Sequence, residues 1–380
     1  MLLLACIVAY VFSGRQYVRG AWITGFGSGY LTPAEVDRTI AAAKAAKLNL
    51  LIVEVRKSAD AYYRSDMEPL ALGVAPGFDP LADLLEKAHA EGIKVHAWVS
   101  VYRVWRGNSH PTDPRHLANR HPEWLCLSRE GVVNAPDGIF VDPGVPEAVN
   151  YTVKVVADIV RSYNIDGLHL DFVRYPDRRW GYSQAALARY RGETRVEGTP
   201  SPDDALWQQW RREQVTNSVR TIRRVVERLK PGLPISAATI AYGDCSTEFA
   251  DTFAYKYLGQ DWWRWLSEDL LDANMPMNYR DARRPESLQQ FRDWLPAFRK
   301  WGAGKPVFVG LAAYMNDSDS LTEQIEEVRR HDMDGFVVFC FNESGIRVVQ
   351  SRHSLARTLA GTDSWWRKWR TSGAAFLKNR

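Results

Sequence analysis

The sequence predicts an α/β protein: a (β/α)8 barrel of the TIM type, built as a single domain with long loops after its strands. Short apolar runs of strand length alternate with segments of helical period, and eight such pairs fit within residues 19–361. Parallel strands buried on both faces have this composition, and eight of them close a barrel. An open doubly wound sheet is the alternative. It is disfavoured because the glycine-rich residues 25–29 do not lead directly into a helix, and no acidic residue follows at the dinucleotide-site spacing.

The elements follow one another in regular order along the chain. The strands are predicted at residues 20–24, 50–55, 94–102, 167–173, 234–241, 271–279, 307–314 and 335–341. The helices are predicted at residues 32–47, 80–90, 146–163, 204–229, 262–268, 287–300, 321–331 and 348–359. The first helix has a strong start signal, since Thr32 is followed by Pro33 and then by Glu35. Long loops follow the third and the fourth strand.

Composition and charge exclude several classes of protein. Of the 380 residues, 25% are charged and 46% are hydrophobic, which excludes a disordered chain, a collagen-like fibre and a polytopic membrane protein. The formal net charge of +4 is too balanced for a nucleic-acid-binding protein. The four cysteines lie far apart without a CxxC pair, so neither a zinc site nor a disulfide framework is expected. We expect a monomer without a metal site.

Both ends of the chain carry segments that we place outside the barrel. Residues 2–12 form an apolar run that suits a signal peptide, and residues 1–18 are therefore expected to be a signal peptide or an N-terminal membrane anchor. Cys6 also fits a lipoprotein processing box as the lipidated residue. The alternative is a chance match in a Leu-rich run. We expect an exported protein, periplasmic or extracellular. Residues 362–380 form a basic aromatic tail that suits peripheral contact with a membrane or cell wall, or a solvated terminal helix.

The fourth predicted strand carries the strongest candidate for catalysis. His169 and Asp171 alternate with apolar residues, so period two places both on one face of the strand. A carboxylate among inward side chains is desolvated unless it has a task or a partner. We therefore take Asp171 as the principal catalytic residue, with His169 and Arg174 as substrate-binding candidates. A structural ion pair between Asp171 and Arg174 is the alternative.

Other strand ends supply further candidates. In the second strand Glu54 and Arg56 share a face, and in the third strand Trp98 and Tyr102 do so. Glu54 is a candidate for a second catalytic carboxylate, or it pairs with Arg56 or Arg103. Trp98 and Tyr102 suit stacking on a sugar ring, or they fill the core.

The remaining candidates lie at or beyond the ends of later strands. Asn278 and Tyr279 are expected to hydrogen-bond a ligand, and Asp244 and Glu343 are alternatives for the second carboxylate. Two carboxyl groups are sought because glycosidases use one to protonate the leaving oxygen and the other to attack the sugar or activate water.

Eight short motifs resemble the glycosyl hydrolase-like family 10, and they occur in the same order as in that family. They begin at residues 19, 53, 76, 95, 121, 142, 166 and 309 (RGAW, VEVR, PGFDP, VHAW, HPEW, DPGVP, DGLHLD and VGLAAY). The resemblance implies a TIM-like barrel, glycan hydrolysis, export and no required cofactor, and Asp171 matches the acidic residue of the family's fourth strand. Two positions depart from the family: Phe172 stands where a second Asp is common, and Glu54 stands where Gln is usual.

Together these observations predict an exported glycoside hydrolase that acts on a bacterial polysaccharide. The resemblance points to peptidoglycan glycan strands as the substrate. The alternative is a catalytically silent barrel that binds glycan without cleaving it, because Phe172 removes one candidate acid.

Overall fold

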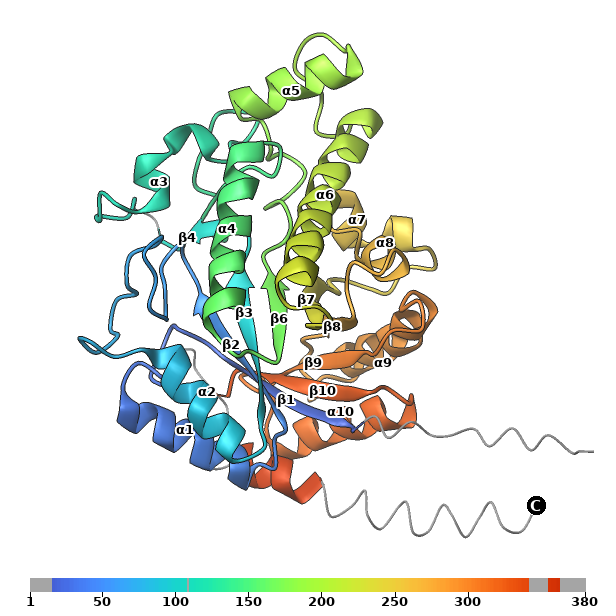
Figure 1. Ribbon diagram of the computed structural model, residues 1–380. Coiled ribbons are helices and arrows are strands. Elements are labelled where there is room, and N and C mark those ends of the chain that lie inside the picture. The colour runs from blue at the N-terminus through green and yellow to red at the C-terminus, as the bar shows by residue number, and fades with distance from the viewer. Residues whose placement is uncertain (1–15, 108, 342–354, 363–380) are drawn as a thin grey trace, which may run out of the picture.

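A computed structural model describes residues 16–107, 109–341 and 355–362 of the chain. Eight parallel strands form a closed barrel in the order β1-β10-β9-β8-β7-β6-β3-β2 (Figure 1). They are β1 (Val18–Ile23), β2 (Leu50–Arg56), β3 (Lys94–Ser100), β6 (Gly167–Asp171), β7 (Ile235–Ile240), β8 (Ala273–Met277), β9 (Phe308–Ala312) and β10 (Gly335–Phe339). The predicted barrel is confirmed, and every predicted strand is present.

Helices connect the strands and cover the outside of the barrel. They are α1 (Pro33–Ala45), α2 (Pro80–Ala90), α4 (Pro146–Ser162), α6 (Ala205–Leu229), α8 (Trp262–Ser267), α9 (Pro285–Lys300) and α10 (Ser318–Arg330). The start signal of α1 forms as predicted, because the Thr32 hydroxyl accepts a hydrogen bond from the Glu35 amide. The last predicted helix, at residues 348–359, lies partly outside the described residues. Residues 355–362 are described and are helical.

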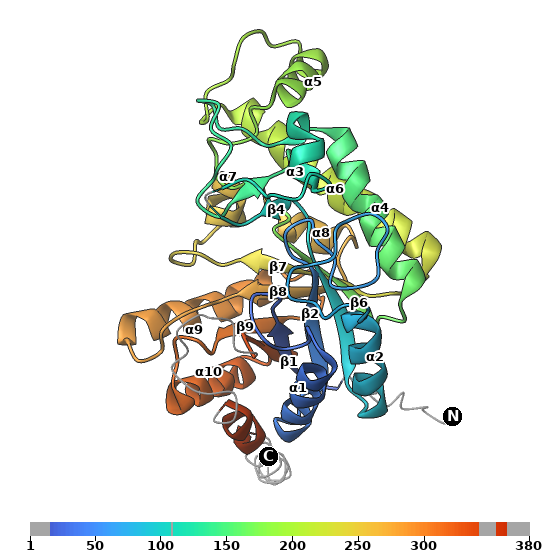
Figure 2. The same ribbon diagram turned by 90° about the vertical axis from the view of Figure 1, so that its left-hand side faces the viewer.

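The long loops contain short elements that the sequence did not predict. They are β4 (Arg103–Trp105), α3 (Leu117–Arg120), η1 (Pro122–Trp124), β5 (Ile139–Phe140), α5 (Gln184–Thr194), η2 (Phe249–Asp251) and α7 (Phe253–Leu258). Strands β4 and β5 pair as an antiparallel sheet of their own. Figure 1 and Figure 2 both place β4, α3 and α5 on the side of the barrel away from α1, α2 and α10. These loops therefore build up one end of the barrel.

The core has two parts, as expected for a closed barrel with helices around it. The larger apolar cluster contains residues from both the strands and the helices. A smaller cluster contains residues of the strands alone, namely Trp22, Leu50, Ile52, Trp98, Met275 and Val337. Because strand side chains alternate, the second set points inward and fills the barrel. Trp22 and Trp98 lie near the carboxyl ends of their strands, so they close the interior of the barrel at that end.

None of the described helices combines the length and the apolar character that a membrane-spanning helix requires.

Candidate active site

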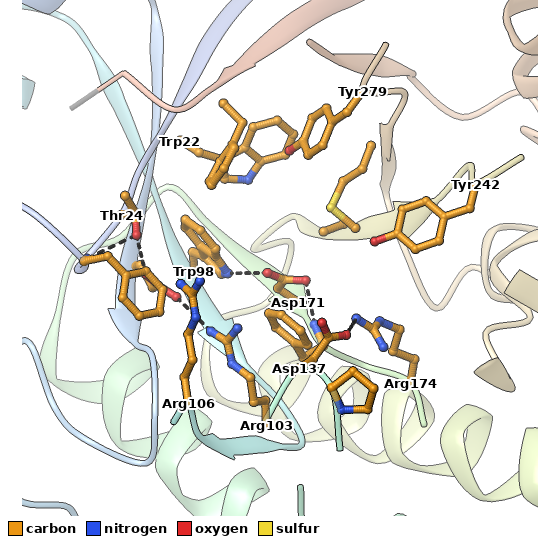
Figure 3. A pocket seen from close by; sticks show the side chains of 17 residues that line it. Trp22, Thr24, Trp98, Arg103, Arg106, Asp137, Asp171, Arg174, Tyr242 and Tyr279 are labelled. Carbon is orange, nitrogen blue, oxygen red and sulfur yellow. Dashed lines mark hydrogen bonds and ion pairs between the residues drawn. The ribbon is translucent and has the colours of Figure 1, made fainter. Parts of the chain in front are cut away.

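A pocket of about 300 Å³ opens at the carboxyl ends of the barrel strands (Figure 3). Strands β1, β2, β3, β6, β7, β8 and β10 each contribute at least one lining side chain. The lining residues are Trp22, Thr24, Phe26, Glu54, Trp98, Arg103, Arg106, Pro136, Asp137, Asp171, Phe172, Arg174, Ala238, Tyr242, Met277, Tyr279 and Phe339. This end of a (β/α)8 barrel is where the catalytic residues of such enzymes lie.

Asp171, the last residue of β6, projects into the pocket. Its Oδ2 accepts a hydrogen bond from Trp98 Nε1 at 3.1 Å, and its Oδ1 accepts one from the Phe172 amide at 2.6 Å. Burial raises the pKa of the Asp171 carboxyl, while Arg103, the Phe172 amide, Arg174 and Trp98 act in the opposite direction. Both oxygens face N–H donors, which stabilise the ionised carboxylate.

Glu54 of β2 supplies a second carboxyl group to the same pocket. Its Oε2 accepts hydrogen bonds from the Thr24 hydroxyl at 2.9 Å and from the Gly25 amide at 3.0 Å. Its Oε1 has no hydrogen-bond partner in the described parts of the chain and lies 3.7 Å from an Arg103 nitrogen. Burial raises the pKa of Glu54 from 4.5 to about 7, although Arg103, the Gly25 amide, Lys57 and Thr24 oppose this shift. The Glu54 carboxyl can therefore carry a proton near neutral pH.

Arg103, on β4, lines the same pocket and acts by its charge on both carboxyl groups. Its positive charge opposes the rise that burial causes in the pKa of both Glu54 and Asp171. Its Nε is buried and finds no hydrogen-bond acceptor among the described residues. From the sequence, Arg103 was expected only as an alternative ion-pair partner of Glu54. The structure adds a position from which it can contact a ligand.

Phe172 follows Asp171 with a left-handed backbone (φ 47°), which is costly for a bulky side chain. The guanidinium carbons of Arg103 and Arg174 lie 3.7 and 4.9 Å from the centre of its ring. These are cation–π contacts. An aromatic ring, rather than a second carboxylate, therefore contacts these two cations in this chain.

Arg174 and Tyr279 both line the pocket, as predicted. Arg174 donates a hydrogen bond to Asp137 Oδ2 at 2.9 Å, so the ion pair that was considered between Arg174 and Asp171 is replaced by one with Asp137. The Tyr279 ring stacks on Phe339, with ring centres 5.7 Å apart.

His169 lies beneath the pocket rather than in it. Its Nε2 accepts a hydrogen bond from Trp22 Nε1 at 3.1 Å, so Nδ1 carries the proton and donates to Ser236 Oγ at 3.0 Å. Burial keeps the pKa of His169 well below its usual value, and the ring stays neutral. His169, predicted to bind substrate, is thus not among the residues that line the pocket; it orients the Trp22 ring, which does line it.

Three other predicted binding residues lie outside the pocket. Arg56 was expected to share a face with Glu54, but the register of β2 against β3 shifts between these two residues. Its guanidinium instead pairs with Glu68. Tyr102 lies beyond the end of β3 and is buried in the main core. Asn278 is fully buried and donates a hydrogen bond to the Phe291 carbonyl.

The two remaining carboxylate candidates are not part of the described pocket. Asp244 lies in an exposed loop after β7, where its Oδ1 accepts a hydrogen bond from Gln290. Glu343 lies outside the described residues. Within the described part of the chain, Glu54 is the carboxyl group that accompanies Asp171, together with Asp137 at the rim. No group of His, Cys, Asp and Glu side chains in that part is arranged to hold a metal ion.

The pair formed by Arg56 and Glu68 gives a prediction about stability. Both side chains are completely buried, and Arg56 donates hydrogen bonds to both Glu68 oxygens. We expect Glu68→Ala to lower the free energy of unfolding by about 3 kcal/mol, because it leaves a buried guanidinium without its counter-charge. Urea denaturation measures this. Glu91→Ala, which breaks the exposed pair with Lys44, is the control and is expected to cost less than about 1 kcal/mol. Equal losses would contradict the prediction.

Comparison with known proteins identifies the family. The glycosyl hydrolase-like 10 family matches residues 17–340. This chain belongs to that family. The resemblance seen in the sequence motifs is thereby confirmed. The chain is 28% identical over 287 residues to glycosyl hydrolase YngK of Bacillus subtilis and 26% identical over 296 residues to glycosyl hydrolase DigH of Escherichia coli.

Each of these alignments covers 70% of this chain, but only 53% of YngK and 62% of DigH. The match therefore spans less than two thirds of each relative. Among solved structures, α-L-fucosidase isoenzyme 2 from Paenibacillus thiaminolyticus superimposes with a TM-score of 0.65 over 93% of this chain and 50% of its own, at 16% identity. At that identity the likeness supports the barrel fold of this glycosyl hydrolase-like 10 member and nothing finer.

Proposed function

We propose that this protein is a glycoside hydrolase in which Asp171 and Glu54 are the two catalytic carboxyl groups. The observation that carries the proposal is their arrangement: both line one pocket at the carboxyl ends of the barrel strands, and the charge of Arg103 acts on both. Membership of the glycosyl hydrolase-like 10 family and the names of the relatives support the same reaction class.

The two carboxyl groups differ in a way that suits different roles. The proton that burial favours on Glu54 passes to the leaving oxygen as the glycosidic C–O bond breaks. In its ionised form, which Arg103 and its two N–H donors favour, Asp171 either attacks the anomeric carbon or takes a proton from the attacking water. In both cases the net reaction adds one water across the glycosidic bond. Arg103 stabilises the negative charge of Asp171, and Trp22, Trp98 and Tyr279 supply aromatic surface for the sugar.

The charge at one end of the pocket supports an anionic glycan as substrate. The guanidinium carbons of the lining residues Arg106 and Arg103 lie 4.6 and 5.7 Å from the centre of the Phe26 ring, and Nζ of Lys57, which is not itself a lining residue, lies 4.6 Å from it. Three cations around one ring favour a sugar that carries carboxylate groups. We therefore propose a bacterial polysaccharide that carries carboxylate groups as the substrate. Peptidoglycan glycan strands, to which the family resemblance points, are the first to test.

This charge gives a prediction for Arg106, which is exposed at the pocket. We expect Arg106→Ala to raise KM several-fold on a carboxylate-bearing glycan, and less at high salt, because exposed charges are screened. Turnover of a neutral glycan should change little. The measurement is a set of initial rates for both glycans at two salt concentrations. An equal rise in KM for the two glycans would contradict a role in charge recognition.

We also propose that the protein works outside the cytoplasm. The apolar run at residues 2–12 supports export, and the basic aromatic run at residues 365–370 supports contact with an anionic surface. Fractionation of cells that produce the full chain tests the location.

The proposed reaction is tested by incubating the full chain with a panel of purified polysaccharides, peptidoglycan glycan strands included. New reducing ends and mass-spectrometric detection of shorter oligosaccharides are the expected result. Tryptophan fluorescence measures binding in parallel. Binding with no bond cleavage over long incubation would overturn the proposal and favour a silent glycan-binding barrel.

A further inference from the structure

A row of three aromatic side chains, two exposed and one half-buried, leads away from the catalytic pocket. It begins at Tyr242, which lines the pocket and follows β7. The ring centre of Tyr242 lies 5.8 Å from that of Phe253, and Phe253 lies 4.8 Å from Tyr257. Tyr242 is 44% exposed and Phe253 is 39% exposed. We call these three residues the aromatic row.

The row is set on structure that holds it beside the pocket. Phe253 and Tyr257 lie one helical turn apart on α7, whose first turn is capped by the Thr252 hydroxyl. The carbonyl of Leu258, at the end of α7, accepts a hydrogen bond from the Tyr175 amide in the loop after β6. The helix is therefore attached to the segment that follows Asp171. The row and the pocket are parts of one end of the barrel.

Exposed aromatic rings of this kind are unusual in the rest of the structure. Most large apolar side chains in the described residues are buried in the core, as a soluble protein requires. Exposed aromatic rings in contact with one another, continuous with a pocket, mark a binding surface. They offer flat apolar faces to the C–H faces of sugar rings, and their spacing is similar to the length of one sugar residue.

Polar groups at the far end of the row suit a sugar as well. The guanidinium carbon of Arg178 lies 5.3 Å from the centre of the Tyr257 ring, and Arg178 also pairs with Asp203. Both side chains are substantially exposed, so they can exchange hydrogen bonds with hydroxyl groups. A protein partner would more often meet a wider apolar patch, whereas a narrow row with polar ends matches a single glycan chain.

We propose that Tyr242, Phe253 and Tyr257 form outer subsites that bind a linear oligosaccharide extending from the catalytic pocket. The enzyme would thus prefer glycan chains over disaccharides. This inference rests on the proposed function, since the occupant of the row is the continuation of the sugar in the pocket. Figure 3 shows Tyr242 on the side of the pocket opposite Thr24 and Arg106, so the chain would cross the pocket between these two sides.

The test compares Phe253→Ala and Tyr257→Ala with Trp263→Ala. Trp263 is the matched control, because it is also an exposed aromatic side chain (46%) but lies on α8 and does not line the pocket. Calorimetry on the full chain measures the affinity for hexasaccharides and disaccharides prepared from the peptidoglycan glycan strand and from chitin. For whichever hexasaccharide the wild type binds, each row variant is expected to weaken binding about 3- to 10-fold. Disaccharide binding and the Trp263→Ala variant should be unaffected.

Phe253→Tyr keeps an aromatic ring and should restore hexasaccharide affinity, which separates a lost subsite from a damaged fold. Equal affinities of the wild type and both row variants for the hexasaccharide would overturn the inference, as would a change in oligomeric state without a change in sugar binding. These results are distinct from failure of the proposed function. That failure appears as an absence of bond cleavage by the wild type, whatever the row variants bind.

Discussion

Replacement of Asp171 by Asn is expected to reduce glycan hydrolysis about 10⁴-fold or more, because the amide can neither attack the anomeric carbon nor activate water. The change is almost isosteric. It still costs some stability, since both Asp171 oxygens accept N–H hydrogen bonds and the new NH2 group must face one of those donors. Binding of the glycan should persist, because the aromatic surfaces of the pocket are untouched. Initial rates and calorimetric affinities measure the two effects separately.

Asp137→Asn is the matched control for this variant. Asp137 also lines the pocket, but its side chain is half exposed and it pairs with Arg174. It contacts neither Glu54 nor Asp171 by any hydrogen bond in the described residues, and we expect it to retain turnover within about tenfold of the wild type. Wild-type turnover in Asp171→Asn, or the same loss in both variants, would contradict the role assigned to Asp171.

Replacement of Glu54 by Gln is expected to lower turnover about 10²- to 10⁴-fold by removing the proton donor. In the wild type, kcat/KM should fall as pH rises through about 7, where Glu54 loses its proton. This alkaline limb should disappear in Glu54→Gln. Substrates with good leaving groups, such as 4-nitrophenyl glycosides, should recover much of the rate in Glu54→Gln but not in Asp171→Asn. Recovery in both variants, or in neither, would contradict the division of roles.

The same substitution has an effect on stability that depends on pH. Folding raises the pKa of Glu54 from 4.5 to about 7, so the buried protonated form contributes stability below pH 4.5 that is lost as pH rises through 7. Gln cannot ionise and does not suffer this loss. We expect Glu54→Gln to gain up to about 3 kcal/mol relative to the wild type between pH 5 and pH 8. Urea denaturation of both proteins at pH 5 and pH 8 measures this gain. If the difference in the free energy of unfolding between the two proteins is the same at both pH values, Glu54 is ionised throughout.

Much of the barrel could be predicted, because buried parallel strands leave an unbroken apolar signal in the sequence. The pocket brings together five of the predicted site residues, namely Asp171, Glu54, Trp98, Arg174 and Tyr279. Polar or aromatic residues at the ends of apolar strands lie at a common edge once the barrel closes. Their catalytic and binding roles remain predictions.

The errors have identifiable physical causes. Period two failed for Arg56 because the pairing of β2 with β3 shifts after Glu54. It failed for Tyr102 because β3 ends at Ser100, after which alternation no longer holds. Arg106, Asp137 and Tyr242 line the pocket from loops, where no period relates position to direction. The contacts of Phe172 with two arginines depend on its left-handed backbone, which a local pattern does not reveal.

The turnover of the double variant Asp171→Asn, Glu54→Gln tests most directly whether one pocket with two cooperating carboxyl groups carries out the reaction. If the two groups act together on the same bond, the turnover of the double variant should lie within about tenfold of the turnover of the slower single variant. The effects of groups that act as a unit are not additive. Losses that multiply would show two independent effects. Turnover close to that of the wild type would contradict the account altogether.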